Sequence, residues 1–172
     1  MMKRLLVPLD GSELAERALV VAGALAESLN GSLMIARVVP PPTPGRFYSS
    51  HLLKELEEAQ LQEGAAYLAA VADRLREDRL TVETRLLHGE VAPTLLDLAD
   101  RERCDLIVIS SHGAGGLGAQ VFGSLARKLL YAARHPVLVV PATAAQLEHE
   151  EEHEEAATDN ALLAELSHAA MR

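Results

Sequence analysis

Cysteine, aromatic residues and long apolar runs are scarce in this chain of 172 residues, and each scarcity argues against a class of protein. A single cysteine, Cys104, allows no intramolecular disulfide, which is typical of a reducing compartment, so we expect a cytoplasmic location. Apolar runs fall short of the roughly 18–20 residues of a membrane span, so we expect no membrane anchor. Residues 1–5 are not followed by the small-residue cleavage pattern of a signal peptide, so we expect no secretory signal. Two Phe, three Tyr and no Trp offer no aromatic platform for stacking bases.

Positive charge is scarce where a nucleic acid would need it. The formal net charge is −9, but residues 145–172 hold eight acidic residues and one basic residue, Arg172. The tail therefore carries −7 of the −9, which leaves −2 on residues 1–144. We expect no nucleic-acid partner, because a nearly neutral body without a basic stripe does not attract a phosphate backbone.

Composition divides the chain into a globular domain over 1–144 and an acidic tail over 145–172. The tail contains a literal H-E-x-x-H, His149 to His153, but this lies in a low-complexity acidic run without the apolar helix face of a zinc protease. We interpret it as a solvated linker. Beyond it, one apolar stripe predicts a short helix: Leu162, Leu163, Leu166, Ala169 and Ala170. An isolated helix of this length is marginal in water, so we expect it to dock on the domain, on a second copy or on a protein partner.

Within residues 1–144, apolar runs alternate with helical patterns. Five strands are predicted, over Leu5–Leu9, Ser32–Val39, Thr81–Leu87, Asp105–Ser110 and Val137–Val140. Four helices are predicted, from the cap Ser12 to Leu29 and over His51–Glu77, Ala92–Asp100 and Ser124–Ala133, with Gly64 weakening the second. This alternation indicates an α/β fold, a five-stranded parallel sheet with helices on both faces, Rossmann-like in type. In such sheets ligands bind beyond the carboxyl ends of the strands, where the strand order reverses.

The most informative segment joins the fourth predicted strand to the fourth helix. Ser110-Ser111-His112-Gly113 follows an apolar run, and Gly123-Ser124 opens a helical pattern. Backbone amides at a helix N-terminus have no partner inside the helix and attract anions, and glycine lets the backbone approach a ligand closely. The segment therefore predicts a phosphate site. If the first and fourth strands are neighbours, Asp10 faces the same crevice.

Over about residues 3–142, the sequence resembles the universal stress proteins, specifically their ATP-binding branch. The strongest part of the resemblance is the glycine signature G-x-x-G-x9-G-[S/T]: Gly113, Gly123 and Ser124 match in register, while Ser110 replaces the first glycine. Further segments match as well, namely Val7–Ser12, His88–Glu90 and Pro136–Val140.

The resemblance implies a cytoplasmic regulatory protein of the stress response that binds ATP, or AMP or ADP, with Mg²⁺ or Mn²⁺ accompanying ATP. It implies that the nucleotide site includes Pro8, Leu9, Asp10, Val38, Ile109, Ser110, His112, Gly113, Gly123, Ser124 and Leu125. In this site Asp10 would accept from a ribose hydroxyl, and Val38, at the end of the second strand, would offer its backbone to adenine. Ile109 and Ser110 would lie near ribose. The phosphates would be held by Gly113, Gly123, Ser124 and the Leu125 amide. The apolar edge strand Val137–Val140 favours a homodimer, because family members pair there.

Other interpretations of these residues remain open. Asp10 and Ser124 could cap helices and bind no ligand. Residues 113–118 satisfy G-x-G-x-x-G, but the acidic residue of a dinucleotide site, about 20 positions on, is missing. Residues 118–123 have the glycine spacing of a P-loop, but Ser124 stands where lysine is required.

Two alternative functions follow from the same residues. The first is a nucleotide-free interaction module that acts through dimerisation, the tail and the loop Pro40–Gly45, with Ser110 as the reason for the lost ligand. The second is a slow ATPase in which His112 is the one candidate base.

Overall fold

The computed structural model describes residues 3–41, 50–112 and 122–141, along which strands and helices alternate. The strands are β1 (Arg4–Pro8), β2 (Ser32–Val39), β3 (Val82–His88), β4 (Leu106–Ser110) and β5 (Val137–Val140). The helices are α1 (Glu13–Leu29), α2 (Ser50–Glu77), α3 (Val91–Arg101) and α4 (Ser124–Ala132). Each predicted element is present, and its boundaries differ from the prediction by one residue at most.

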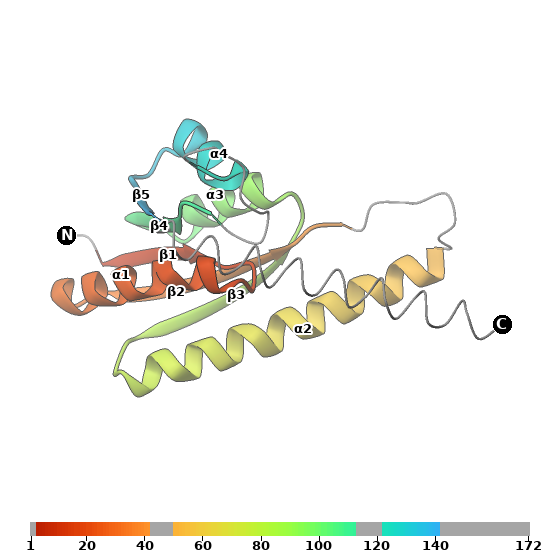
Figure 1. Cartoon of the computed structure of the whole chain (residues 1–172), viewed down its shortest axis with the longest axis horizontal. Helices are drawn as coiled ribbons and strands as arrows, with labels where there is room; N and C mark the ends of the chain where they lie inside the picture. Colours follow the sequence, from red (N-terminus) through yellow and green to blue (C-terminus); the bar gives the residue numbers. More distant parts are fainter. Residues whose placement is uncertain (1–2, 42–49, 113–121, 142–172) are drawn as a thin grey trace, which may run out of the picture.

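The five strands form one parallel sheet in the order β3-β2-β1-β4-β5 (Figure 1). β2 and β3 are added on one side of β1, and the chain then crosses to the other side of β1, where β4 and β5 are added. The strand order therefore reverses between β1 and β4, which is where ligands bind in open α/β sheets. The predicted fold class is confirmed, and β1 and β4 are neighbours.

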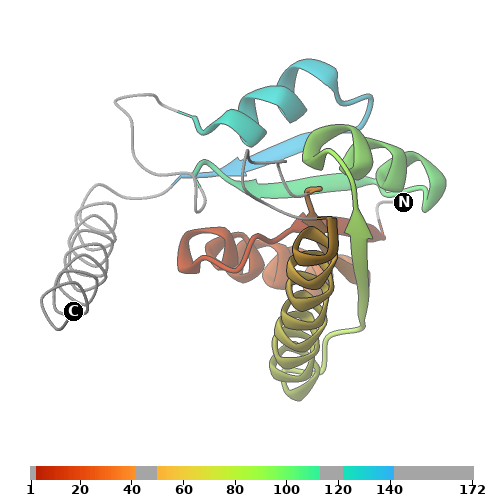
Figure 2. The ribbon, with the colours of Figure 1, turned by 90° about the vertical axis from the view of Figure 1, so that its right-hand side faces the viewer.

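Helices cover both faces of this sheet, with α1 and α2 on one side and α3 and α4 on the other (Figure 2). The core under α1 and α2 includes Leu5, Val7, Leu33, Ile35 and Val108. The core under α3 and α4 includes Leu6, Met34, Ala36, Ile107 and Ile109. Successive strand residues point to opposite faces, so burial on both faces explains why the central strands are apolar at nearly every position.

Local sequence signals set the ends of α1. Ser12 is the N-cap, and its Oγ accepts a hydrogen bond from the Ala15 N–H at 3.1 Å. At the other end Asn30 takes the left-handed conformation, with φ of 48°. Gly31 follows where a Cβ would lie 2.6 Å from the Lys3 carbonyl oxygen, so only glycine lets the chain pass β1 there.

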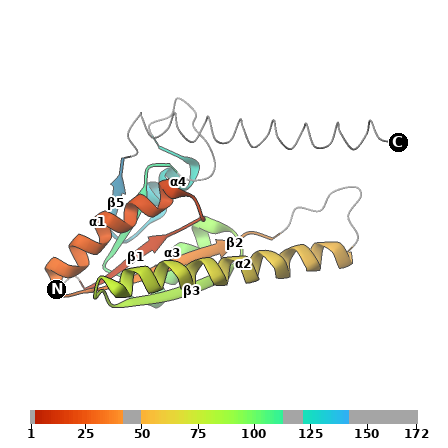
Figure 3. The ribbon, with the colours of Figure 1, turned by 60° about the horizontal axis from the view of Figure 1, so that its bottom comes forward.

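The long helix α2 runs past the sheet, and its buried residues lie in its second half (Figure 3). Gly64 is predicted to weaken the helix, and a glycine in a helix interior does cost about 1 kcal/mol relative to alanine. In the structure a Cβ at this position would lie 2.9 Å from Cδ1 of Leu86 on β3, so a larger residue would require the Leu86 side chain to shift.

Several predicted features lie outside the described residues. They are Gly113, most of the loop Pro40–Gly45 and everything from residue 142 onward. The division at residue 144 and the tail helix therefore stay predictions. In the part of the chain that the structure describes, no helix combines the length and apolar character needed to cross a membrane.

Candidate functional site

Between β1 and β4 the backbone ladder is short. It contains two register pairs, Leu5 with Leu106 and Leu6 with Ile107. By contrast, β1 stays paired with β2 up to Pro8, and β4 stays paired with β5 up to Ser110. The sheet is thus unpaired between β1 and β4 over their last residues, at the point where the strand order reverses and polar groups of a ligand can approach.

On the β1 side of this interruption the strand leads into a turn stabilised by hydrogen bonds. Pro8 is the last strand residue, and the N–H of Leu9 donates to the Ala36 carbonyl at 2.8 Å. Asp10 is exposed, and its Oδ1 accepts from the N–H of Ser12 at 2.9 Å and from the Ser12 hydroxyl at 2.7 Å. The alternative in which Asp10 caps α1 is wrong, because Ser12 is the cap and Asp10 orients it.

Three of the predicted site residues are buried core residues. Leu9 belongs to the core under α1 and α2, whereas Val38 and Ile109 belong to the core under α3 and α4. Val38 is the next-to-last residue of β2, not its end as predicted. With their side chains packed inside, these residues offer a ligand mainly backbone atoms, as expected for contacts to adenine and ribose.

Ser110, the residue in place of the first signature glycine, has its side chain inside the protein. Its relative exposure is 3%, and its Oγ is inaccessible and has no hydrogen-bond partner among the described residues. Strand alternation places it on the same face as Val108, under α1. The substitution therefore buries a hydroxyl, and it adds no side chain to the exposed end of β4.

A hydrogen bond closes the base of the segment between β4 and α4. The N–H of Ser111 donates to the Val140 carbonyl at 2.7 Å, and the N–H of Gly123 donates to the Ser111 carbonyl at 2.7 Å. A Cβ on Gly123 would lie 3.2 Å from that carbonyl oxygen. Gly123 is thus the residue at which the returning chain can approach β4 this closely. This role of Ser111 was not predicted from the sequence.

The N-terminus of α4 begins directly at this closure. Gly123 is the N-cap without a side-chain hydrogen bond, and the first intrahelical bond runs from the Arg127 N–H to the Gly123 carbonyl. Ser124 is the first helical residue and is exposed, so the alternative in which it caps α4 is wrong. Leu125 packs against the core, and helix geometry leaves the first-turn amides without an intrahelical partner, an arrangement that suits an anion.

His112 is a buried neighbour of this closure, with 9% relative exposure, and its Nδ1 lies 3.1 Å from the Ser111 Oγ. This packing favours a role in ordering the backbone over proton transfer. No group of three or more metal-ligating side chains occurs within residues 3–41, 50–112 and 122–141. The Mg²⁺ or Mn²⁺ expected with ATP stays a prediction.

A polar cluster beneath the Asp10 turn was not predicted. Arg37 of β2 lies with its guanidinium carbon 5.4 Å from the centre of the Tyr67 ring, and the Tyr67 hydroxyl donates to Glu16 at 2.9 Å. Burial, followed by the hydrogen bond to Glu16, raises the pKa of Tyr67 above its ordinary value. The available signal in the sequence was a single charged residue, Arg37, in a strand that is otherwise almost wholly apolar.

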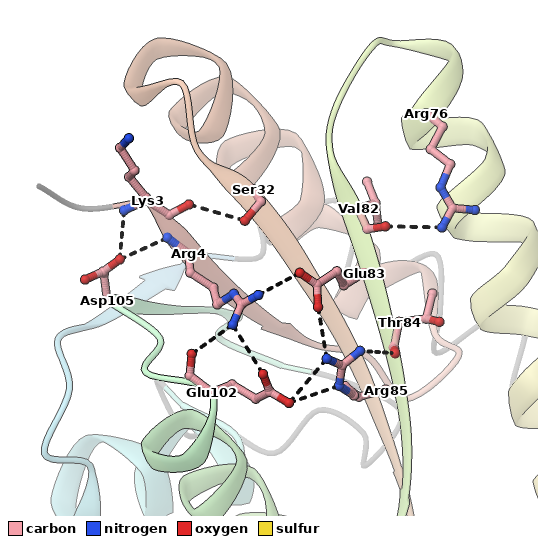
Figure 4. Close-up of polar contacts among 10 residues, drawn as sticks. All are labelled: Lys3, Arg4, Ser32, Arg76, Val82, Glu83, Thr84, Arg85, Glu102 and Asp105. Atoms are coloured by element: carbon pink, nitrogen blue, oxygen red, sulfur yellow. Dashed lines mark hydrogen bonds and ion pairs between the residues drawn. The ribbon is translucent and has the colours of Figure 1, made fainter.

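A second polar cluster lies at the opposite, amino end of the sheet (Figure 4). Arg4 and Arg85 alternate with Glu83 and Glu102 in a closed ring, in which each carboxylate gives one oxygen to each arginine at 2.7–3.2 Å. Burial opposes ionisation of Glu83, but the hydrogen bonds from both arginines hold its pKa below the ordinary value. The charges cancel within the ring, so it joins β1, β3 and the end of α3 without an excess charge for a ligand.

The fold and these motifs have counterparts among known proteins. The model of the universal stress protein family matches residues 1–141. A universal stress protein of Thermus aquaticus is 34% identical over 143 residues, which cover 81% of this chain and 99% of that protein. The universal stress protein YxiE of Bacillus subtilis is 30% identical over 147 residues, with 81% and 99% covered.

Solved structures of universal stress proteins share the fold. One in complex with cAMP has a TM-score of 0.63 at 24% identity, over 83% of this chain and 98% of that one. One from Archaeoglobus fulgidus in complex with dAMP has a TM-score of 0.54 at 24% identity, over 81% and 97%. One from Arabidopsis thaliana with AMP bound has a TM-score of 0.58 at 14% identity, over 83% and 94%.

Proposed function

This chain belongs to the universal stress protein family, and we propose that it is a stress-response regulator that binds an adenine nucleotide where β1 and β4 part. The observation that carries the proposal is the short ladder between these strands, with the Asp10 turn on one side and the α4 N-terminus on the other. A carboxylate suits a ribose hydroxyl, and free helix amides suit phosphates.

The nucleotides bound in three family structures, cAMP, dAMP and AMP, support an adenine nucleotide as the ligand. We extend this to ATP, accompanied by Mg²⁺ or Mn²⁺, on the strength of the glycine signature. The buried position of Ser110 supports the extension, since its side chain does not stand in the path of the ligand. The proposed contacts are those expected from the resemblance, except that the Gly123 N–H already donates to the Ser111 carbonyl, so the phosphates fall to the amides of Ser124 and Leu125. Gly113 lies outside the described residues.

A homodimer through β5 is part of the proposal. This strand is at the edge of the sheet and apolar, and all four of its residues are partly exposed. An edge strand of this kind presents unpaired backbone groups to a second copy. The proposal also places the protein in the cytoplasm, in line with a single buried thiol, and leaves the acidic tail as a contact for a protein partner.

The test is to look for nucleotide in the purified protein. The full chain is heat-denatured and the supernatant is analysed by anion exchange, and nucleotide-free protein is titrated with AMP, ADP and ATP by calorimetry. Released or titrated adenine nucleotide supports the proposal. A clean supernatant and no heat of binding overturn it in favour of the nucleotide-free module, and steady release of ADP from ATP indicates the slow ATPase.

A further inference from the structure

Arg37 is a charged side chain in a strand that is otherwise almost wholly apolar. It lies on β2, its side chain is 17% exposed, and its Nη2 is 3.5 Å from a Glu63 carboxylate oxygen on α2. The guanidinium also lies over the Tyr67 ring. Arginine stacks on aromatic faces and pairs with carboxylates at once, so α2 holds this side chain in one place.

Gly11 is the glycine that lies closest to Arg37. A Cβ on Gly11 would lie 3.2 Å from the Arg37 Nη1, which is tight, whereas a Cβ on Gly64 of α2 would meet the Arg37 Cδ at an ordinary 3.5 Å. Gly11 has φ of +97°, a conformation that other residues rarely adopt. Arg37 thus packs between α2 and the backbone of the turn that follows β1.

That turn carries Asp10. The amide and the hydroxyl of Ser12 donate hydrogen bonds to the Asp10 carboxylate and orient it. Gly11 lies between these two residues in the chain, and the Arg37 guanidinium packs against Gly11. Removing the guanidinium leaves a space under the turn, and the turn can sink or rotate into it.

We propose that Arg37 is a positioning residue of the nucleotide site, which supports the Gly11 turn so that Asp10 meets a ribose hydroxyl. Tyr67 and Glu63 fix Arg37 on α2, and Glu16 fixes Tyr67 through its hydroxyl. The inference rests on the proposed adenine-nucleotide site. It adds that selection for a ribonucleotide depends on a residue that does not itself touch the ligand.

The test measures how far the protein prefers AMP over 2′-deoxy-AMP and 3′-deoxy-AMP. In the wild-type chain we expect about tenfold weaker binding of at least one deoxynucleotide, as for the loss of one charge-assisted hydrogen bond. Asp10→Asn should reduce this ratio, and Arg37→Leu should reduce it to the same extent. The double variant Asp10→Asn/Arg37→Leu should have the same affinity ratio as Asp10→Asn alone. Arg37→Lys should have a ratio between those of Arg37→Leu and the wild-type chain.

Arg74→Leu is the matched control. Arg74 pairs with Glu16 in the same cluster, but its side chain is 63% exposed. It should leave the ratio unchanged. If Arg37 has only a structural role, Arg37→Leu should weaken the binding of all three nucleotides equally, and this result would overturn the inference. An affinity ratio that is unchanged in Arg37→Leu would overturn it as well.

The two proposals fail differently. If the wild-type chain binds none of the three nucleotides, the nucleotide site itself is wrong and the inference falls with it. If the wild-type chain binds AMP preferentially and the Arg37 variants do too, only the inference is wrong. Should Arg37→Leu fail to fold, Arg37→Lys and Glu63→Gln provide the comparison, and wild-type ratios in both overturn the inference.

Discussion

The N–H of Gly123 donates to the carbonyl of Ser111 at 2.7 Å, and this bond joins the end of β4 to the start of α4. The segment that carries the signature glycines therefore has a closed base. The φ of Gly123, −61°, is open to other residues, but a Cβ there would lie 3.2 Å from the Ser111 carbonyl oxygen. A larger residue at 123 would therefore push this carbonyl back by a few tenths of an ångström.

Gly123→Ala is expected to weaken AMP binding about tenfold, because the added Cβ pushes the Ser111 carbonyl away and opens this base. Calorimetric titration of the folded variant measures the change. Gly23→Ala is the matched control, since its Cβ would lie 3.3 Å from a flexible leucine end, Cδ1 of Leu80. Equal affinities in the wild-type chain and Gly123→Ala would contradict the placement of phosphates at the α4 N-terminus.

Ser110→Ala is expected to raise the free energy of unfolding by about 1 kcal/mol, since it removes a buried hydroxyl without a partner among the described residues. Urea unfolding measures the difference. Ser12→Ala is the contrasting control, because that hydroxyl caps α1 and its loss should lower stability by about 1 kcal/mol. A loss of stability in Ser110→Ala would mean that its Oγ makes a hydrogen bond.

The sequence predicts most of the fold because its signals are local. Buried strands appear as short apolar runs, and Ser12 and Asn30 give the ends of α1 through their own chemistry. The predicted bounds of Ser32–Val39 and Val137–Val140 agree with the structure to the residue. Both strands lie between clear breakers, Gly31 and Pro40 for the first and Pro136 and Pro141 for the second.

The site is less predictable, since its geometry comes from contacts between distant parts of the chain. The direction of the Ser110 side chain depends on strand register, and the support of Gly11 by Arg37 depends on a helix that begins after both. Gly64 shows the same effect, because its helix propensity is a property of the sequence whereas its contact with Leu86 is a property of the packing.

Asp105→Asn is expected to lower stability at neutral pH and to lose this effect in acid. The Asp105 carboxylate accepts from the backbone N–H groups of Lys3 and Arg4 at 2.8 and 2.9 Å, and these bonds lower its pKa (Figure 4). Because the pKa of Asp105 is lower in the folded state than in the unfolded state, its ionised carboxylate stabilises the fold. This stabilisation is present above the unfolded-state pKa of about 3.9 and is lost as pH falls through the folded-state pKa. Urea unfolding at pH 7, 5 and 3 measures it.

The difference between the wild-type chain and Asp105→Asn should thus shrink steadily below about pH 4. Asp73→Asn is the control, because Asp73 is an exposed carboxylate that pairs with Arg76 within one helical turn and should affect stability little at any pH. A difference for Asp105→Asn that stays constant down to pH 3 would show that the hydrogen bonds do not depend on the charge.

Cys104 should react with a disulfide reagent only when the domain opens. The thiol is 3% exposed, and burial raises its pKa to about 11, so little thiolate is present at pH 8. We expect slow labelling of the native protein and complete labelling in urea, with Cys104→Ser as the blank. Since labelling then follows opening, a bound nucleotide should slow it in proportion to its saturation. Fast labelling that AMP does not change would show local access to Cys104, and the thiol would then report neither stability nor binding.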